Sequence, residues 1–258
     1  MSSPDKIKAI VLSYDRHRAI TDHMILQYAR LWPDHPFVFL VPYQTLQRPD
    51  TERVKYVKAP GGKASDIPFT ILELIANLDD EELVYWASDD KYPIQLLTNK
   101  IAGLISHAMR SPDVSGLLFC RCGTTLDKPK RALYRHKVRN PFGDVYLERK
   151  AWYQIWIHQL LRAKVLRHLF THLPDHIPNA KAMDELKNDV PKLAEHRLFV
   201  TKESFAVFGE STQGGVITQN CYESILAAGI ELPEWFRHPN GHHLTMGKLS
   251  DSYRSSNA

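Results

Sequence analysis

Short apolar segments alternate with amphipathic ones through the first ninety residues, and this alternation restricts the chain to few folds. Four segments have the apolar pattern of strands, and two have the spacing of amphipathic helices. The predicted strands are 8–13, 37–41, 54–57 and 83–86, and the predicted helices are 19–31 and 67–78. The order strand, helix, strand, strand, helix, strand predicts an α/β fold with a doubly wound, mostly parallel sheet and helices on both faces.

The second half of the chain is less regular. Predicted helices cover 96–109, 151–173 and 218–228, and predicted strands cover 114–120, 197–201 and 204–208. Gly214 and Gly215 indicate a turn, and Gly229 indicates the end of a helix. We therefore expect residues 125–249 to form a mixed α+β half of the same domain, followed by a flexible tail at 250–258.

The composition is that of a soluble globular protein. Of 258 residues, 43% are apolar and 24% are charged. We find no apolar run of about 18 residues, the length of a transmembrane helix, and no signal-peptide core at the N-terminus. The three cysteines, an odd number, favour reduced thiols in a cytosol. Cys120 and Cys122 lack a second cysteine pair, which argues against a zinc site.

The charge is distributed unevenly along the chain. Residues 128–167 contain 11 Lys or Arg and two acids, Asp144 and Glu148, which gives a net charge of +9. Because the whole chain carries +4, the remainder carries −5. A basic segment in an otherwise acidic chain indicates an anionic partner, such as a phosphate, an acidic glycan or a membrane surface. The same charge could bind nucleic acid, but no RRM, KH, helix-turn-helix or zinc-finger pattern is present, so we expect no nucleic acid.

Polar side chains follow the first and the fourth predicted strands. The sequence S-Y-D-R stands at 13–16, and the acids Asp89 and Asp90 follow Ser88. An open α/β sheet binds ligands at the carboxyl ends of its strands, and carboxylate oxygens there suit a hard divalent cation and hence a phosphate. The alternative is that Ser88, Asp89 and Asp90 form only a polar turn and that Asp15 only caps a helix.

These features resemble the GT-A glycosyltransferases, which use nucleotide sugars. Residues 13–16 are similar to the S/T-Y-N/D-R opening with which many of these enzymes hold the nucleoside. Residues 88–90 are similar to the DxD motif of the family, with Ser88 in place of the first acid. The order and spacing of the elements between the two motifs also fit. The resemblance covers roughly the first 120 residues and implies a donor-binding half at 1–124.

The resemblance implies a role for each of these polar residues. Those expected to hold the nucleotide sugar are Ser13, Tyr14, Asp15, Arg16, Lys63, Ser88 and Asp89. Asp90 is the implied ligand of Mn²⁺ or Mg²⁺, which would neutralise charge on the departing phosphate as a Lewis acid. A late histidine sometimes supplies another metal ligand in the family, and His242 is the candidate. The alternative for Lys63 is a solvated loop lysine.

A base for the acceptor hydroxyl must come from the second half if the sugar is transferred with inversion. The family often has an acidic pair at the start of a helix in this region, which makes Asp184 and Glu185 the candidates. The alternative is a solvated helix face. His168, His172 and His176 are spaced four residues apart, but the Glu of a zinc-binding HExxH motif is absent, which favours surface histidines.

The sequence thus predicts a metal-assisted glycosyltransferase that moves a sugar from a nucleoside-diphosphate sugar to a glycan or lipid-linked acceptor in polysaccharide biosynthesis. One rival is a nucleotidyltransferase of related fold, which the absence of a glycine-rich loop after the first strand disfavours. The other is a catalytically silent GT-A-like binding or scaffold protein, which Ser88 keeps open.

The predicted helix at 151–173 bears on cellular location. Its apolar residues alternate with basic ones from Arg149 to Arg167. An apolar face with a cationic rim can lie on an anionic membrane, which would suit a lipid-linked acceptor. The alternative is a core helix with a solvated basic face. We therefore expect a cytoplasmic protein with possible peripheral contact at the inner face of the membrane.

Overall fold

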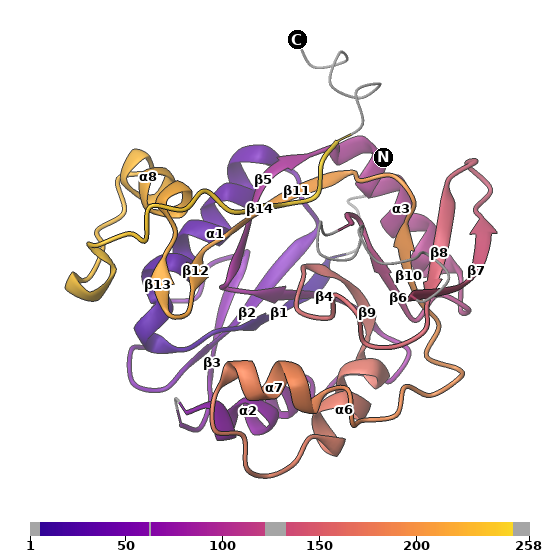
Figure 1. Cartoon of the computed structure of the whole chain (residues 1–258), viewed down its shortest axis with the longest axis horizontal. Helices are drawn as coiled ribbons and strands as arrows, with labels where there is room; N and C mark the ends of the chain where they lie inside the picture. The colour runs from indigo at the N-terminus through magenta and orange to yellow at the C-terminus, as the bar shows by residue number, and fades with distance from the viewer. Residues whose placement is uncertain (1–5, 62, 122–132, 250–258) are drawn as a thin grey trace.

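A nine-stranded sheet runs through the molecule (Figure 1). The computed structural model describes residues 6–61, 63–121 and 133–249. In spatial order the strands are β3 (Val54–Lys58), β2 (Phe37–Tyr43), β1 (Ile7–Leu12), β4 (Leu83–Ser88), β9 (Gln159–Arg162), β6 (Gly116–Leu118), β10 (Leu198–Thr201), β8 (Val145–Arg149) and β7 (Tyr134–Arg139). The first four are parallel, and β6 pairs with β10 in parallel, whereas β9, β8 and β7 pair antiparallel with their neighbours. The expected α/β class is confirmed.

Helices cover both faces of this sheet (Figure 1). Those packed in one core are α1 (Arg18–Leu31), α3 (Thr98–Arg110) and α8 (Gln219–Ala227), and those in the other are α2 (Ile67–Leu74), α6 (Ala163–His172) and α7 (Ala180–Leu186). Successive side chains of a strand point to opposite faces. In β1, Ala9 and Val11 therefore join the first core while Ile10 joins the second. This two-sided burial explains the continuous apolar runs in the sequence.

A smaller sheet begins where the fourth strand ends. It consists of β14 (Thr245–Met246), β11 (Ala206–Glu210) and β5 (Lys91–Leu96), all antiparallel. Only Asp89 and Asp90 separate β4 from β5, so the two acids form the turn between the sheets. The sequence analysis predicted a strand at 204–208, which overlaps β11, but none at β5 or β14. Pro93 is tolerated in β5 because it pairs with Phe208 beside a β-bulge, where a strand can accept proline.

The predicted long helix at 151–173 was wrong. Residues 151–158 form turns, and the segment then forms strand β9 before α6 begins at Ala163. β9 inserts between β4 and β6, so Leu160 and Leu161 are buried on opposite faces of the sheet. A fully buried strand followed by a buried helix face gives an apolar pattern that resembles one longer helix.

The membrane-facing surface expected from that helix is likewise not present. Trp152 and Ile157 are buried, and Arg149 is buried completely. Arg162 is also buried and donates to the backbone carbonyls of Val114 and Ser111. Arg149 and Arg162 therefore serve the core, whereas Lys164 and Arg167 are partly exposed and pair with Glu81 and Asp80. Among the described residues, no helix is both long and apolar enough to cross a membrane.

Candidate functional site

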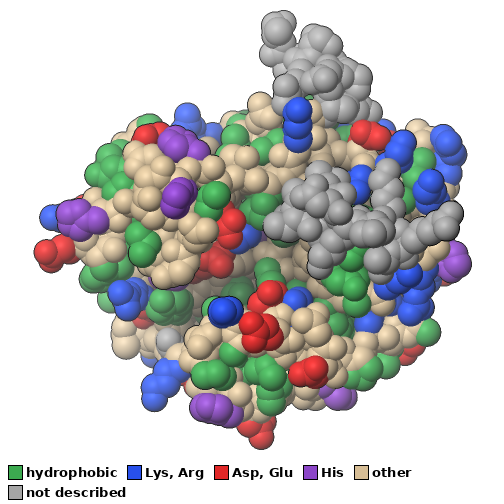
Figure 2. Space-filling view, in the orientation of Figure 1, with side chains coloured by type: hydrophobic (Ala, Val, Ile, Leu, Met, Phe, Trp, Pro, Cys, Tyr) green, Lys and Arg blue, Asp and Glu red, His purple; other side chains and the backbone are tan. Residues whose placement is uncertain are grey.

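A cavity of about 970 Å³ opens at the carboxyl ends of β1 and β4. Figure 2 shows a hollow in the middle of the face viewed, with acidic and basic side chains around it. One wall carries the strand ends and the smaller sheet. The opposite wall carries α7, the loop before α2 and the turns at 153–157. The volume lies within the range of small-molecule sites in proteins.

The register of β1 against β4 brings the two predicted motifs together. Leu12 pairs with Ser88, and the Asp89 amide donates to the Leu12 carbonyl over 3.0 Å. Ser13, Tyr14, Ser88, Asp89 and Asp90 consequently line the same cavity. Parallel pairing of two strands far apart in sequence thus joins the motifs that the sequence showed separately.

Asp89 is held by a histidine that the sequence analysis did not single out. It is 6% exposed, and its Oδ2 lies 3.1 Å from His17 Nδ1. His17 Nε2 lies 3.0 Å from the Tyr14 hydroxyl. Burial disfavours charge on His17, but the charge of Asp89 and the hydrogen bond with its carboxylate outweigh it, so the pKa of His17 lies above its ordinary value. Burial, followed by the charge of Asp89, raises the pKa of Tyr14.

Asp90 is anchored by the two residues that follow β11, Ser211 and Thr212. Its Oδ1 accepts a hydrogen bond from the Thr212 hydroxyl over 2.9 Å, and its carbonyl accepts one from the Ser211 amide over 2.6 Å. The Asp90 amide donates to the Ser88 hydroxyl over 3.3 Å. In the described residues Oδ2 of Asp90 has no hydrogen-bond or ion-pair partner, and it remains available to a ligand.

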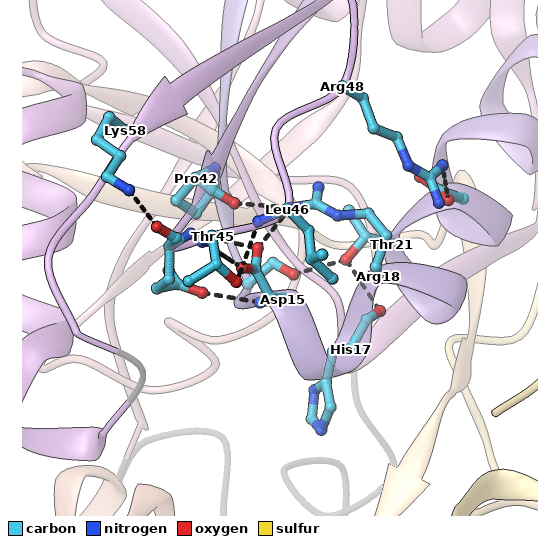
Figure 3. Close-up of polar contacts among 12 residues, drawn as sticks. Asp15, His17, Arg18, Thr21, Pro42, Thr45, Leu46, Arg48 and Lys58 are labelled. Carbon is cyan, nitrogen blue, oxygen red and sulfur yellow. Dashed lines mark hydrogen bonds and ion pairs between the residues drawn. The ribbon is translucent and has the colours of Figure 1, made fainter. Parts of the chain in front are cut away.

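Asp15 lies outside the cavity lining, and its carboxylate points to the loop after β2 (Figure 3). It accepts hydrogen bonds from the amides of Gln44, Thr45 and Leu46 and from the Thr45 hydroxyl. Burial alone would raise its pKa, but these hydrogen bonds lower it to about 2. The roles expected for Asp15, in holding the nucleotide sugar, and for Asp90, in holding its metal ion, require both to lie at one cleft. The cleft is present and Asp90 lines it, whereas Asp15 braces the loop beside it.

Arg16 and Lys63, the two basic residues expected to bind the nucleotide sugar, differ in their position relative to the cavity. Arg16 is exposed, stays outside the lining, and stacks over the indole of Trp235 at 5.5 Å. Lys63 does line the cavity, next to the start of the 3₁₀ helix η2 (Ala64–Asp66). Lys181, which the sequence analysis did not consider, lines it as well.

The predicted acidic pair is split by the helix that carries it. Asp184 lines the cavity from α7, whereas the exposed Glu185 does not. Oδ1 of Asp184 accepts from Trp156 Nε1 over 2.6 Å and lies 2.7 Å from Lys187 Nζ. Neighbouring helix residues point about 100° apart, which explains why only one of the pair faces inward.

A further acid lines the cavity without any sequence signal. Glu210 ends β11 and pairs with the buried Lys91 across the small sheet, with Oε1 3.2 Å from Nζ. Neither Glu210 nor Lys91 belongs to a recognisable sequence motif. The only indication in the sequence of a role at the site would have been a charged residue next to an apolar strand.

The acids offer a divalent cation a partial rather than a complete set of ligands. In the described part of the chain, no group of three or more His, Cys, Asp or Glu residues could hold a metal ion. His242 is exposed and does not line the cavity, so the structure does not bring it to Asp90. The carboxylates of Asp89 and Asp90 are of the chemical type that would hold Mg²⁺ or a similar ion together with a ligand's phosphates and water.

Comparison with known proteins gives distant structural matches. No protein-family model matches the chain, and no curated protein does. TarS 1–349 from S. aureus matches 78% of this chain at 15% identity with a TM-score of 0.44, and the chain covers 59% of it, less than two thirds. The galactosyltransferase LgtC, solved with donor and acceptor sugar analogs, matches 74% of this chain and 68% of its own at 12% identity and a TM-score of 0.40.

A cytidylyltransferase matches to the same degree. The Francisella tularensis 2-C-methyl-D-erythritol 4-phosphate cytidylyltransferase IspD matches 88% of this chain and 100% of its own, at 10% identity and a TM-score of 0.42. Similarity this distant assigns no roles to residues. The roles proposed below rest on the cavity of this chain.

Proposed function

We propose that the chain is a glycosyltransferase that binds a nucleoside-diphosphate sugar in this cavity and transfers the sugar to a glycan or lipid-linked acceptor. The observation that carries the proposal is the meeting of Tyr14, Asp89 and Asp90 at the carboxyl ends of two parallel strands, inside a cavity of about 970 Å³. This is the position where open α/β sheets bind their ligands. The resemblance of both strand ends to the GT-A motifs supports the choice of ligand.

The charges of the cavity suit a diphosphate. Asp90, with Asp89 beside it, would hold Mn²⁺ or Mg²⁺, which would stabilise the negative charge that grows on the leaving phosphate. Lys63 and Lys181 line the cavity, and in the described residues neither ammonium group has an ion-pair partner. Both would attract the phosphates of the nucleotide sugar. The Tyr14 hydroxyl, which shares a hydrogen bond with His17 Nε2, could donate to the nucleotide sugar when that nitrogen carries a proton and donates to Tyr14.

The acceptor base stays a proposal with Asp184 as its first candidate. Asp184 faces the cavity, but Trp156 and Lys187 already bind its Oδ1, which leaves Oδ2 for an acceptor hydroxyl. Glu210 is the alternative carboxylate on the wall that carries Asp90. Comparing transfer by the Asp184→Asn and Glu210→Gln variants would decide between them.

Cell fractionation would test the cytoplasmic location expected from the sequence.

Calorimetric titration of UDP and GDP, and of their sugars, with and without Mn²⁺ tests the proposal. We expect one nucleotide to bind, Mn²⁺ to strengthen binding, and Asp90→Ala to weaken it at least about tenfold, since a direct ligand matters no less than its supporting residues. Asp34→Ala changes an exposed acid outside the cavity lining and serves as the control. Absence of binding, or binding indifferent to Asp90→Ala, would contradict the proposal.

A further inference from the structure

A chain of buried hydrogen bonds crosses the first core and ends at the acidic turn. The Tyr85 and Tyr28 hydroxyls lie 2.8 Å apart, and the Tyr28 hydroxyl lies 2.7 Å from His158 Nδ1. His158 Nε2 lies 2.8 Å from the carbonyl oxygen of Ser88. The three side chains come from β4, α1 and the turn before β9, and each is at most 1% exposed. The chain therefore links three separate elements to the peptide that precedes Asp89.

Hydrogen-bond chemistry fixes the direction of this chain. A carbonyl oxygen can only accept, so His158 Nε2 must carry a proton and donate to Ser88. Burial lowers the pKa of His158 to about 3, so the ring is neutral and its Nδ1 accepts from Tyr28. Because the hydroxyl proton of Tyr28 is donated to His158, the Tyr28 oxygen can only accept from Tyr85, whose hydroxyl is the donor. Every polar atom in the chain is satisfied in one arrangement only.

The Ser88 carbonyl lies at the junction between strand β4 and the turn that carries Asp89 and Asp90. Residue 88 is the last of β4, and the following peptide carries Asp89. The carboxylates themselves are tethered by two side chains, the partly buried His17 and the buried Thr212. The backbone beneath them is tethered from inside the core by His158. A rotation of the peptide between Ser88 and Asp89 would turn both acids away from the cavity.

We propose that His158 is a positioning residue that fixes the Ser88–Asp89 peptide and thereby aims Asp89 and Asp90 at the bound ligand. This inference deepens the proposed function and rests on it for the identity of the ligand. His158 touches neither substrate nor cation, and it acts through the Ser88 carbonyl alone. Residues that support a metal ligand in this indirect way typically affect affinity 10–100-fold.

The test compares His158→Leu with His158→Gln. Leucine removes both hydrogen bonds, whereas glutamine can donate from its amide nitrogen to Ser88 and accept from Tyr28 with its amide oxygen. With UDP or GDP plus Mn²⁺ as probe, we expect a dissociation constant raised about 10–100-fold in His158→Leu and largely restored in His158→Gln. Equal affinity in His158→Leu and the wild type would overturn the inference.

A matched control separates positioning from general destabilisation. His35 is also a buried, neutral histidine of the aromatic core, with a pKa lowered by burial to about 4, and its Nδ1 accepts from the Phe37 amide. It lies at the amino end of β2, away from the cavity. His35→Leu should lower the melting temperature but leave probe affinity unchanged. An equal loss of affinity in both leucine variants would refute a specific role for His158.

A readout without ligand keeps this inference separate from the proposed function. The amides of Asp89 and Asp90 are hydrogen-bonded to the Leu12 carbonyl and the Ser88 hydroxyl. Their hydrogen exchange should accelerate in His158→Leu and not in His35→Leu. If the wild type binds neither nucleotide, the proposed function fails while exchange still decides the positioning role. Unchanged exchange at both amides would reject it.

Discussion

At the scale of single residues, the aspartates of the two motifs at 13–16 and 88–90 differ in position: those of the second line the cavity, and that of the first supports a loop. Asp89 and Asp90 face the cavity, whereas Asp15 accepts hydrogen bonds from three consecutive amides of the loop after β2. All three are aspartates that follow the end of a strand, and nothing in their sequence context distinguishes Asp15 from the other two. The difference arises because the loop at 44–46 closes over Asp15 and offers donors to it.

Replacing Asp15 should reduce stability in a pH-dependent way. Its folded pKa of about 2 lies below the ordinary value of 3.8, so it stabilises the fold fully above pH 4, and this contribution is lost as the pH falls through about 2. We expect Asp15→Asn to lower the free energy of unfolding by about 2 kcal/mol at pH 7, and by less near pH 2.5. Urea denaturation at both pH values measures this.

The control for this change is Asp34→Asn, which alters an exposed acid after α1 and should change stability by less than about 0.5 kcal/mol. If Asp15→Asn were as stable as the wild type at pH 7, the amides of the loop at 44–46 would be hydrogen-bonded to water as favourably as to the Asp15 carboxylate.

The hydrogen bond from Thr212 to Asp90 makes a second prediction at this scale. Thr212→Val keeps the shape but removes the donor, which frees the Asp90 carboxylate to rotate. Loss of one such bond, about 1 kcal/mol, corresponds to about a fivefold weaker affinity for UDP or GDP with Mn²⁺. Thr212→Ser should restore it. Equal affinity of the valine and serine variants, measured by calorimetry, would argue against this anchor.

At the scale of elements, β9 decides how the two halves meet. It runs antiparallel between β4 and β6, and its Leu161 is buried in the second core next to α6. The segment has helical apolar spacing, yet it becomes a strand because a gap between two strands can accept only an extended chain with both faces buried. Tertiary pairing here outweighs the local pattern.

The burial of β9 predicts a large effect at Leu161. Leu161→Ala should lower the free energy of unfolding by about 2–5 kcal/mol, since it removes a fully buried side chain and leaves a cavity. Leu226→Ala, the same change at a side chain of α8 that is 52% exposed, should cost less than about 0.5 kcal/mol. Chemical denaturation compares the two. Similar small losses would mean that 159–162 is not a central strand.

At the scale of the whole molecule, the sheet joins both halves of the chain. The halves predicted at 1–124 and 125–249 alternate in it, because β9 separates β4 from β6 and β10 lies beyond β6. The cavity likewise takes Asp90 from the first half and Asp184 from the second. Donor and acceptor functions, as proposed, would therefore share one cooperative unit.

This architecture predicts that the first half does not fold by itself. A fragment of residues 1–124 lacks β9, which leaves the inner edges of β4 and β6 unpaired and the second core without α6. We expect it to show no cooperative thermal transition by circular dichroism, in contrast to the full chain. A sharp transition in the fragment would show that the donor half is an independent domain.

The sequence alone determined the α/β class, because buried parallel strands and amphipathic helices leave local apolar patterns that depend on short-range periodicity. It also identified the strand ends at 13–16 and 88–90 as the polar positions to examine. Local pattern could not reveal which side chains turn inward. His17, Glu210 and His158 carry no motif, and they reach the site only through contacts between residues distant in sequence.

Tertiary structure decided the rest, for the same physical reason in each case. The position of the Asp15 carboxylate depended on a loop about thirty residues later in the chain. The extended conformation of residues 159–162 depended on the space between β4 and β6. Hydrogen-bond donors and packing surfaces act over a few ångströms in space, whatever their separation along the chain. Which polar residue binds a ligand and which one supports the fold is settled by that proximity.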